Sequence, residues 1–400
     1  MNPVGSVGTP RLARVDGRGG LSVDGSGIRL DWWVGADDRW RIATDEAAVR
    51  QRRLGAAPAY ETALRVPSGD VFHRVYAIGG AGDPVLLEIE NDSPAPVALA
   101  LVLHGLRPGT RLDGTRLELG HDLALDATKT AGHVITAPDR ATLLATVERG
   151  ERVHPTTTSL PEGSAVVGLL HPIAHRTRAR FALVLDPAGA PTVDLVAAPS
   201  ATDAARGWDA MLRRGMQVVF ADAGRQTSTD QARADLLLES GLPGAGAEAF
   251  VALEDWGFDA EAVELWRRLG WRARRRAGRD RSRSSVAPLI DPPGGEPADA
   301  AARLRVARDA VIAERSDGAI VLAPAAPAPG EPLEVHDAPT RAGSVSYAIR
   351  WHGERAALLW DVQPLAAVRL VAPGLDAGWT TDEPSGEVLL GPALVSEGGA

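Results

Sequence analysis

Short runs of alternating apolar and polar residues fill the first half of the chain, and this pattern predicts β-strands. Residues 71–80 (VFHRVYAIGG) alternate, residues 84–106 hold two apolar runs separated by Asn-Asp-Ser-Pro, and residues 179–186 (ARFALVLD) form another run. Alternation with a period of two is typical of strands, and Gly, Pro, Asn and Asp mark the turns between them. Many such strands at short spacing favour an antiparallel sandwich. We therefore assign residues 1–200 to a β-sandwich domain.

The apolar spacing becomes helical near Gly207. Residues 208–222 and 228–241 carry apolar residues at helical spacing, and the second stretch has Ser228 or Thr229 as N-cap and Gly241 at its end. Residues 247–253 and 259–269 predict a further pair of helices, broken by a Trp-Gly-Phe turn, with Asp259 as the cap of the second. Together with a helix expected at residues 298–314, these form a helical-hairpin region over residues 201–317.

Two more segments complete the expected organisation. Residues 271–297 are rich in arginine and then in Ser, Pro and Gly, and because dense like charge resists burial we expect an exposed linker there. Residues 344–362 (SVSYAIRWHGERAALLWDV) predict a hairpin with His352 and Gly353 at its turn. Residues 318–400 are therefore a small C-terminal β-domain, and the predicted fold class is α+β multidomain.

Composition narrows the classes of partner. The 400 residues are 44% hydrophobic and 24% charged, which is typical of a folded globular protein. The formal net charge of -9 argues against a nucleic acid partner. The chain has no cysteine, no apolar run long enough to span a bilayer and no apolar leader at its N-terminus. We expect a cytoplasmic protein with no membrane partner.

The order of sandwich, helical hairpins and small β-domain resembles that of bacterial six-hairpin glycosidases, the glucoamylase-like and glycoside phosphorylase-like enzymes built on an (α/α)6 barrel. Three stretches carry the resemblance: ETALRVPSGDVFHRVYAIGG with LLEIENDSPAPVALALVL, WDAMLRRGMQVVFADAGRQTSTDQARADLLL, and PLEVHDAPTRAGSVSYAIRWHGERAALLWDV with LVAPGLDAGWTTDEPSGEVLL. Twelve helices with their loops need roughly 190 residues. Residues 208–318 have room for about half of that set, so the barrel is expected to be shortened, as a partial α/α toroid.

The candidate catalytic residues are Glu254 and Asp255, adjacent acids on a turn between helices. Glycoside hydrolysis needs two carboxylates on either side of the scissile bond. Adjacent residues of a helix point about 100° apart, so at most one of the two acts, together with a distant partner. In the alternative reading both acids lie on the solvated end of a helix, while Trp256 and Phe258 pack the turn.

Three tryptophans are candidates for binding a sugar, because indole faces pack well on the apolar faces of pyranose rings. These are Trp256, in the same turn, and Trp32 and Trp33, in the segment LDWWVGADDRW. The alternative is that they fill the core. No metal site and no cofactor is expected: the pair His171 and His175 contains Pro172 and follows a strand-like run, and no phosphate-binding or dinucleotide-binding loop is present.

The sequence therefore predicts a carbohydrate-associated protein that is non-catalytic or weakly active, because its barrel is shortened. One alternative is an active glycoside hydrolase or phosphorylase with Glu254 or Asp255 as general acid or base. Another is an interaction scaffold without a sugar ligand, which would expose its linker and its helical face to a partner. An apolar helical face left open by missing hairpins would favour a homo-oligomer.

Overall fold

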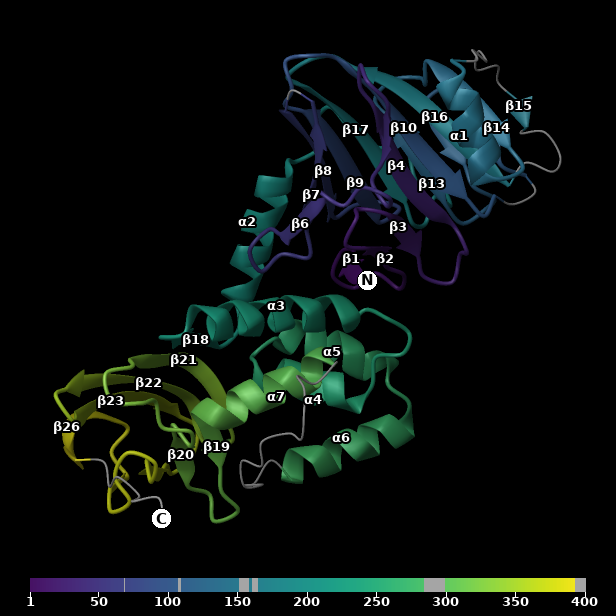
Figure 1. Ribbon diagram of the computed structural model, residues 1–400. Helices are drawn as coiled ribbons and strands as arrows, with labels where there is room; N and C mark the ends of the chain where they lie inside the picture. Colours follow the sequence, from purple (N-terminus) through teal and green to yellow (C-terminus); the bar gives the residue numbers. More distant parts are fainter. Residues whose placement is uncertain (68, 107–108, 151–157, 160–164, 284–298, 393–400) are drawn as a thin grey trace, which may run out of the picture. The chain divides into compact units, whose positions relative to one another are not determined.

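The computed structural model describes residues 1–67, 69–106, 109–150, 158–159, 165–283 and 299–392 (Figure 1). These residues form seven helices and four sheets, none of them closed, which confirms the mixed α+β class. Internal contacts divide the chain into an N-terminal unit, Met1–Gly207, and a C-terminal unit, Trp208–Ala400. Each unit is described by itself.

The N-terminal unit contains two sheets of antiparallel strands. Sheet A has the order β1 (Asn2–Val4), β2 (Ala13–Val15), β3 (Leu21–Val23), β4 (Arg29–Gly35), β10 (Val97–His104), β16 (Val166–Ile173) and β14 (His133–Ala137), with β5 (Trp40–Ile42) paired to β4. Sheet B has the order β15 (Thr158–Ser159), β11 (Arg111–Asp113), β12 (Arg116–Glu118), β13 (Ala124–Ala127), β17 (Thr177–Val184), β9 (Pro84–Asn91), β8 (Gly69–Ala77), β7 (Tyr60–Val66) and β6 (Arg50–Arg53).

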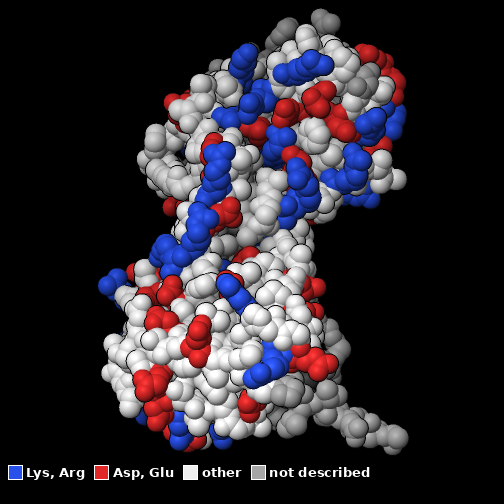
Figure 2. Space-filling view, turned by 90° about the vertical axis from the view of Figure 1, so that its left-hand side faces the viewer, with Lys and Arg blue, Asp and Glu red and all other residues white. Residues whose placement is uncertain are grey.

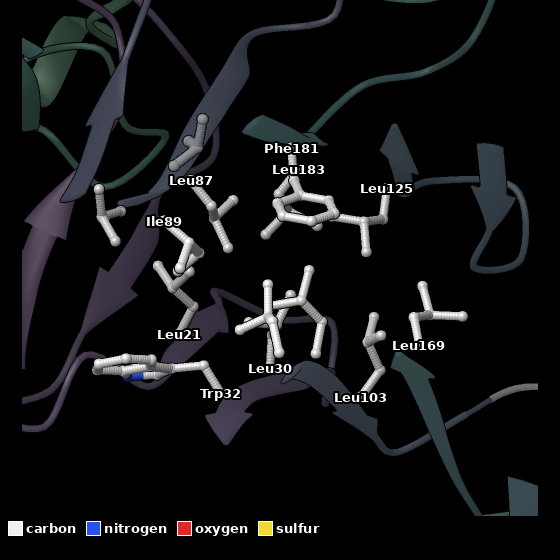
Figure 3. Packing of buried hydrophobic residues seen from close by; sticks show 14 of the residues in the cluster. Leu21, Leu30, Trp32, Leu87, Ile89, Leu103, Leu125, Leu169, Phe181 and Leu183 are labelled. Carbon is white, nitrogen blue, oxygen red and sulfur yellow. The ribbon is translucent and has the colours of Figure 1, made fainter. Parts of the chain in front are cut away.

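Buried side chains from both sheets share one hydrophobic core. Figure 3 shows Leu30, Trp32 and Leu103 of sheet A lying opposite Leu87 and Phe181 of sheet B. Each of these side chains is at most 1% exposed. Burial of apolar surface from both sheets in one cluster is the main stabilising interaction of this unit.

The two strands expected within residues 84–106 are present, but they do not form a hairpin. Strand β9 lies in sheet B and β10 lies in sheet A, so the Asn-Asp-Ser-Pro segment leads from one sheet to the other. Asn91 is fully buried there, and its side-chain amide donates to the carbonyl of Ala95 at 2.8 Å. Its oxygen accepts from the backbone N–H and the hydroxyl of Ser93. These bonds satisfy a buried polar side chain and fix the crossing.

A second, smaller core lies on the other face of sheet A. Helix α1 (Arg140–Glu148) covers this face and buries Leu143 and Val147 against Trp33 and Val102. The helix begins at the N-cap Asp139, whose carboxylate accepts the N–H of Thr142 at 2.8 Å. Such a cap satisfies one of the free donors at a helix start.

A row of opposite charges crosses sheet B from β6 to β17. The register places the partners directly beside one another in the order Arg52, Glu61, Arg74, Glu88 and Arg180. We call these five residues the charge ladder. Its ion pairs are 2.7 to 3.2 Å long. Figure 2 shows basic and acidic side chains close together on the visible face of the N-terminal unit.

Helix α2 (Ala201–Leu212) runs across the boundary between the units. The remaining helices lie in the C-terminal unit and are α3 (Ala223–Glu239), α4 (Ala247–Asp255), α5 (Asp259–Arg268), α6 (Trp271–Arg283) and α7 (Ala300–Val311). The helix expected at residues 208–222 ends at Leu212, and the following Gln217–Phe220 forms strand β18. Val218 is buried in the pairing of β18 with β21, so sheet formation overrides the helical spacing.

The other two sheets belong to the C-terminal unit. Sheet C has the order β18 (Gln217–Phe220), β21 (Leu333–Thr340), β22 (Gly343–His352), β23 (Arg355–Pro364) and β26 (Ser385–Pro392), and sheet D has the order β19 (Ile312–Glu314), β20 (Ile320–Leu322), β24 (Leu370–Val371) and β25 (Thr380–Thr381). The hairpin expected at residues 344–362 is confirmed by β22 and β23, which turn at Gly353 with a φ of 64°.

Two of the expected segment boundaries differ from the structure. Because β18 pairs with β21, sheet C crosses the boundary expected near residue 317 and joins helical and β-rich segments in one unit. The linker expected at residues 271–297 begins instead with helix α6, since Ala277 is fully buried and anchors this basic segment. Residues 284–298 of that linker lie outside the described residues.

Candidate functional site

The turn between α4 and α5 contains the candidate acids and is closed by backbone hydrogen bonds. The N–H groups of Trp256, Gly257 and Phe258 donate to the last carbonyls of α4, those of Ala252, Glu254 and Leu253, at 2.8 to 3.1 Å. Gly257 has a φ of 74°, a conformation in which a side chain would be strained. The glycine therefore ends α4 and lets α5 begin two residues later.

The two aromatic residues of this turn lie in the core. Trp256 is fully buried and Phe258 is 1% exposed. The indole N–H of Trp256 donates to the carbonyl of Leu304 in α7 at 3.2 Å. A ring buried on all sides and bonded to a neighbouring helix has no face left for a sugar. In this structure Trp256 is a packing residue, and the expected stacking role has no exposed surface to support it.

A buried arginine completes this packing. The guanidinium carbon of Arg233 in α3 lies 5.5 Å from the ring centre of Trp256 and 5.7 Å from that of Phe258. The side chain is 2% exposed and pairs with Asp230 at 3.0 Å. Burial lowers the pKa of Arg233, and the negative charge of Asp230 opposes this effect. Contacts between a cation and aromatic faces gain strength when water is excluded.

The start of β18 lies directly against the same turn. The N–H of Met216 donates to the carbonyl of Trp256 at 2.9 Å. A Cβ atom added to Gly215 would stand 2.4 Å from that carbonyl oxygen, which is closer than van der Waals contact allows. The missing side chain of Gly215 is therefore what permits sheet C and the helices to meet at this point.

The two candidate acids lie directly before the turn. Glu254 and Asp255 are both half-buried at the end of α4. The backbone carbonyl of Asp255 accepts from the side chain of Arg308 in α7 at 3.2 Å. Arg308 also donates to the carbonyl of Pro339 at 2.7 Å, so it ties α4 to β21. The backbone of Asp255 is therefore held by α7.

A second carboxylate, Asp309 of α7, lies within electrostatic reach of Asp255. The protein packed around Asp309 raises the pKa of its carboxyl, although the residue keeps contact with water. The charge of Asp255 raises it further, and the neighbouring Arg308 and Arg305 oppose the shift. A pair of carboxylates with unequal environments can accept hydroxyl groups and can also hold a proton on one member. We call Asp255 and Asp309 the acid pair.

The sequence did not single out Asp309, since a lone acid in a predicted helix carries no spacing signal. It also did not indicate Arg233, whose burial depends on the meeting of α3 with the turn. The structure does not make a shared site from Glu254 and Asp255 alone, because the carboxyl whose pKa is raised by the charge of Asp255 belongs to Asp309, on another helix. The catalytic roles of Glu254 and Asp255 stay predictions.

The other two candidate tryptophans lie in the N-terminal unit and are also buried. Trp32 is 1% exposed, points into the core shared by sheets A and B (Figure 3), and donates its indole N–H to the carbonyl of Arg18 at 3.0 Å. Trp33 is fully buried in the small core beneath α1, where the guanidinium carbon of Arg140 lies 6.0 Å from its ring centre. Successive residues of a strand point to opposite faces, so the two rings fill two different cores.

Comparison with known proteins adds no relative. No protein-family model matches the chain, and no curated protein matches it. Within the described ranges no group of three His, Asp or Glu side chains is placed to hold a metal ion. No helix of the described residues is long and apolar enough to cross a membrane.

Proposed function

We propose that this chain is a carbohydrate-associated protein related to the six-hairpin glycosidases, with little or no hydrolytic activity. The observation that carries the proposal is the acid pair, in which the half-buried Asp255 of α4 lies within electrostatic reach of the exposed Asp309 of α7. Carboxylate oxygens accept hydrogen bonds from hydroxyl groups, and charge-assisted bonds of this kind are strong. A sugar presents neighbouring hydroxyls that two such carboxylates can bind together.

The order of elements supports the same proposal. The two sheets of the N-terminal unit read as the β-sandwich of the glycosidase-like architecture, α3 to α7 as its helical layer, and the later strands of sheet C as its terminal β-domain. Between residues 208 and 318, five helices lie wholly within the described residues. A full six-hairpin barrel has twelve helices, so the loops that would complete a catalytic mouth are fewer here. This shortage is the reason for proposing binding over hydrolysis.

Calorimetric titration with neutral oligosaccharides tests the proposal. We expect saturable binding of a maltose-type tetrasaccharide to the wild-type chain, without release of reducing ends. Asp255→Asn and Asp309→Asn should each weaken binding about tenfold, the loss of one charge-assisted hydrogen bond. The matched control is Asp259→Asn, an exposed acid at the start of the next helix, which should leave the affinity unchanged. No binding of any oligosaccharide would instead favour the interaction scaffold.

The raised pKa of Asp309 favours one second candidate function, an active glycoside hydrolase. A proton donor in such an enzyme needs a carboxyl that keeps its proton while its partner is ionised. In this reading Asp309 is the general acid and Asp255 the second carboxylate. Hydrolysis of 4-nitrophenyl glycosides would then fall as the pH rises through the pKa of Asp309, and Asp309→Asn would abolish this pH dependence. Equal, background rates for wild type and both variants would exclude this candidate.

A further inference from the structure

Helix α6 carries a concentration of positive charge that the acid pair does not use. Its thirteen residues include seven arginines and one aspartate. Because the whole chain has a net charge of -9, the rest of the chain carries -15. Such segregation of charge onto one helix creates a local positive field on an otherwise acidic protein.

The described side chains that fix α6 to its own unit lie in its first half. Ala277 is fully buried, and Arg276 pairs with Glu248 of α4 at 2.6 Å. Arg274 donates to the carbonyl of Trp266 at 2.9 Å, and its guanidinium carbon lies 5.1 Å from that ring. A cation that caps the last carbonyls of α5 interacts favourably with the helix dipole. These contacts hold one side of α6, while Trp271, Arg272 and Arg275 are exposed.

That outer side presents an indole flanked by two cations. Trp271 is 63% exposed, and the guanidinium carbons of Arg272 and Arg275 lie 5.8 and 5.2 Å from its ring centre. Among the described side chains, no carboxylate pairs with Arg272 or Arg275. The three side chains form what we call the α6 patch. It combines an apolar ring with two positive charges that pair with none of the described acids.

We infer that the α6 patch binds an acidic polysaccharide, a glycan that bears carboxylate or sulfate groups. The apolar face of a sugar ring stacks on the indole of Trp271. The guanidinium groups of Arg272 and Arg275 match the planar geometry of a carboxylate or sulfate and bind it with paired hydrogen bonds. This inference rests on the proposed carbohydrate association and names the class of glycan involved.

Two other polyanions fit the α6 patch less well. A nucleic acid duplex carries a charge about every 1.7 Å, and the -15 on the rest of the chain repels such a polymer. An interfacial helix enters a membrane by burying an apolar face. The buried Ala277 of α6 faces its own protein, which leaves a single exposed indole for the lipid. A glycan has a lower density of charge and needs only one stacking ring.

Calorimetric titration of the full chain with tetragalacturonate tests the inference, and maltotetraose is the neutral probe of equal length. We expect tetragalacturonate to bind more tightly, with an affinity that falls as salt rises. Trp271→Ala should weaken this binding about tenfold, and Arg272→Gln and Arg275→Gln by about threefold to tenfold each. The control Arg267→Gln removes an exposed arginine that already pairs with Glu264 and should change nothing.

Each result decides between the two proposals. Binding of maltotetraose without binding of tetragalacturonate overturns the inference and leaves the proposed function standing, whereas binding of neither sugar overturns both. Binding of tetragalacturonate that ignores Trp271→Ala and Arg275→Gln places the acidic glycan elsewhere and also overturns the inference. An oligothymidylate or phosphatidylglycerol vesicles that bind through these same residues more tightly than tetragalacturonate would replace the partner class. Because Trp271 is exposed, circular dichroism should show unchanged folding of its variant.

Discussion

The two units of the chain each bury a charged side chain, and they satisfy it in different ways. In the N-terminal unit Glu88 is 2% exposed and lies within 2.8 to 3.5 Å of three arginines, Arg74, Arg178 and Arg180. In the C-terminal unit Arg233 is equally buried but has one carboxylate partner and two aromatic rings.

The difference follows from the geometry of the elements. Neighbouring strands place residues directly side by side, so a register that alternates in sign gives a buried acid several partners. Neighbours on a helix are three or four residues apart. This spacing gives Arg233 one described carboxylate partner, Asp230, and tertiary packing supplies the rings of Trp256 and Phe258. In this chain the sheet neutralises Glu88 through its register, while Arg233 depends on aromatic packing and on the carbonyl of Leu212 in addition to Asp230.

The largest expected effect comes from removing an aromatic ring that packs on Arg233. Trp256→Ala should lower the free energy of unfolding by about 4 kcal/mol, because it leaves a cavity and removes a ring from Arg233. Urea denaturation measures the change. The control is Trp271→Ala, which truncates an exposed indole and should cost less than about 0.5 kcal/mol. A cost below about 1 kcal/mol for Trp256→Ala would contradict the packing role of the turn.

The second-largest effect comes from neutralising the buried acid of the charge ladder. Glu88→Gln should lower the free energy of unfolding by about 3 kcal/mol, since three arginines then share a site without their buried counter-charge. Glu90→Gln is the matched control on the same strand. Its side chain is 36% exposed and it pairs with Arg74 at the rim, so the cost should stay below about 1 kcal/mol. Equal costs for both variants would show that burial in the ladder is unimportant.

A third effect, of similar size, is a pH dependence of stability caused by His73, a buried residue of the N-terminal unit. His73 is fully buried, its ring centre is 5.1 Å from that of Trp32, and no described atom bonds its two ring nitrogens. Burial lowers the pKa of His73 from 6.5 to about 3. Between these values the unfolded chain binds the proton and the folded chain does not, so stability falls as the pH falls from 6.5 towards 3.

Replacing His73 should remove this loss of stability at low pH. At pH 4 the linkage amounts to about 3 kcal/mol relative to neutral pH. Denaturation of wild type and of His73→Phe, each at pH 7 and pH 4, measures it as the difference between the two pH dependences. His171 is also buried, with its pKa lowered to about 4, and stays in both proteins as a constant background. Identical pH dependences would contradict the neutral state of His73.

The smallest expected effect tests the backbone conformation of Gly257 in the Trp-Gly-Phe turn. Gly257→Ala places a side chain at a φ of 74° and should lower the free energy of unfolding by about 1 to 2 kcal/mol. Gly270→Ala is the control, because its φ is not left-handed and a Cβ there meets no atom within 4 Å. Thermal unfolding of both variants should show a lower Tm for Gly257→Ala alone.

The sequence predicts the helices and strands of this chain better than it predicts which of them pack or pair together. The hairpin at residues 344–362 and the helices on both sides of the Trp-Gly-Phe turn are visible in the local pattern of residues. The pairing of β18 with β21 is not, since it joins residues more than a hundred positions apart. Residues 208–222 read as one helix because their apolar spacing is helical, and only sheet C makes Gln217–Phe220 a strand.

The same limit applies to the candidate site. The acids Glu254 and Asp255 could be found from their position beside a glycine-broken turn. Asp309 could not, because its proximity to Asp255 arises only when α7 packs on α4. For Trp32, Trp33 and Trp256 the sequence offered both a sugar platform and a core role, and burial selects the core role. The exposed indole, Trp271, stood in a segment that composition alone describes as a linker.

The most direct measurement for the proposed carbohydrate association is a titration of wild type and Asp255→Asn with the same neutral oligosaccharide, with reducing ends assayed in parallel. We predict saturable binding to the wild type, about tenfold weaker binding to the variant, and no release of reducing ends by either protein. Release by the wild type that the variant lacks would make the chain a hydrolase. Absence of binding to any neutral or acidic glycan would contradict the association itself.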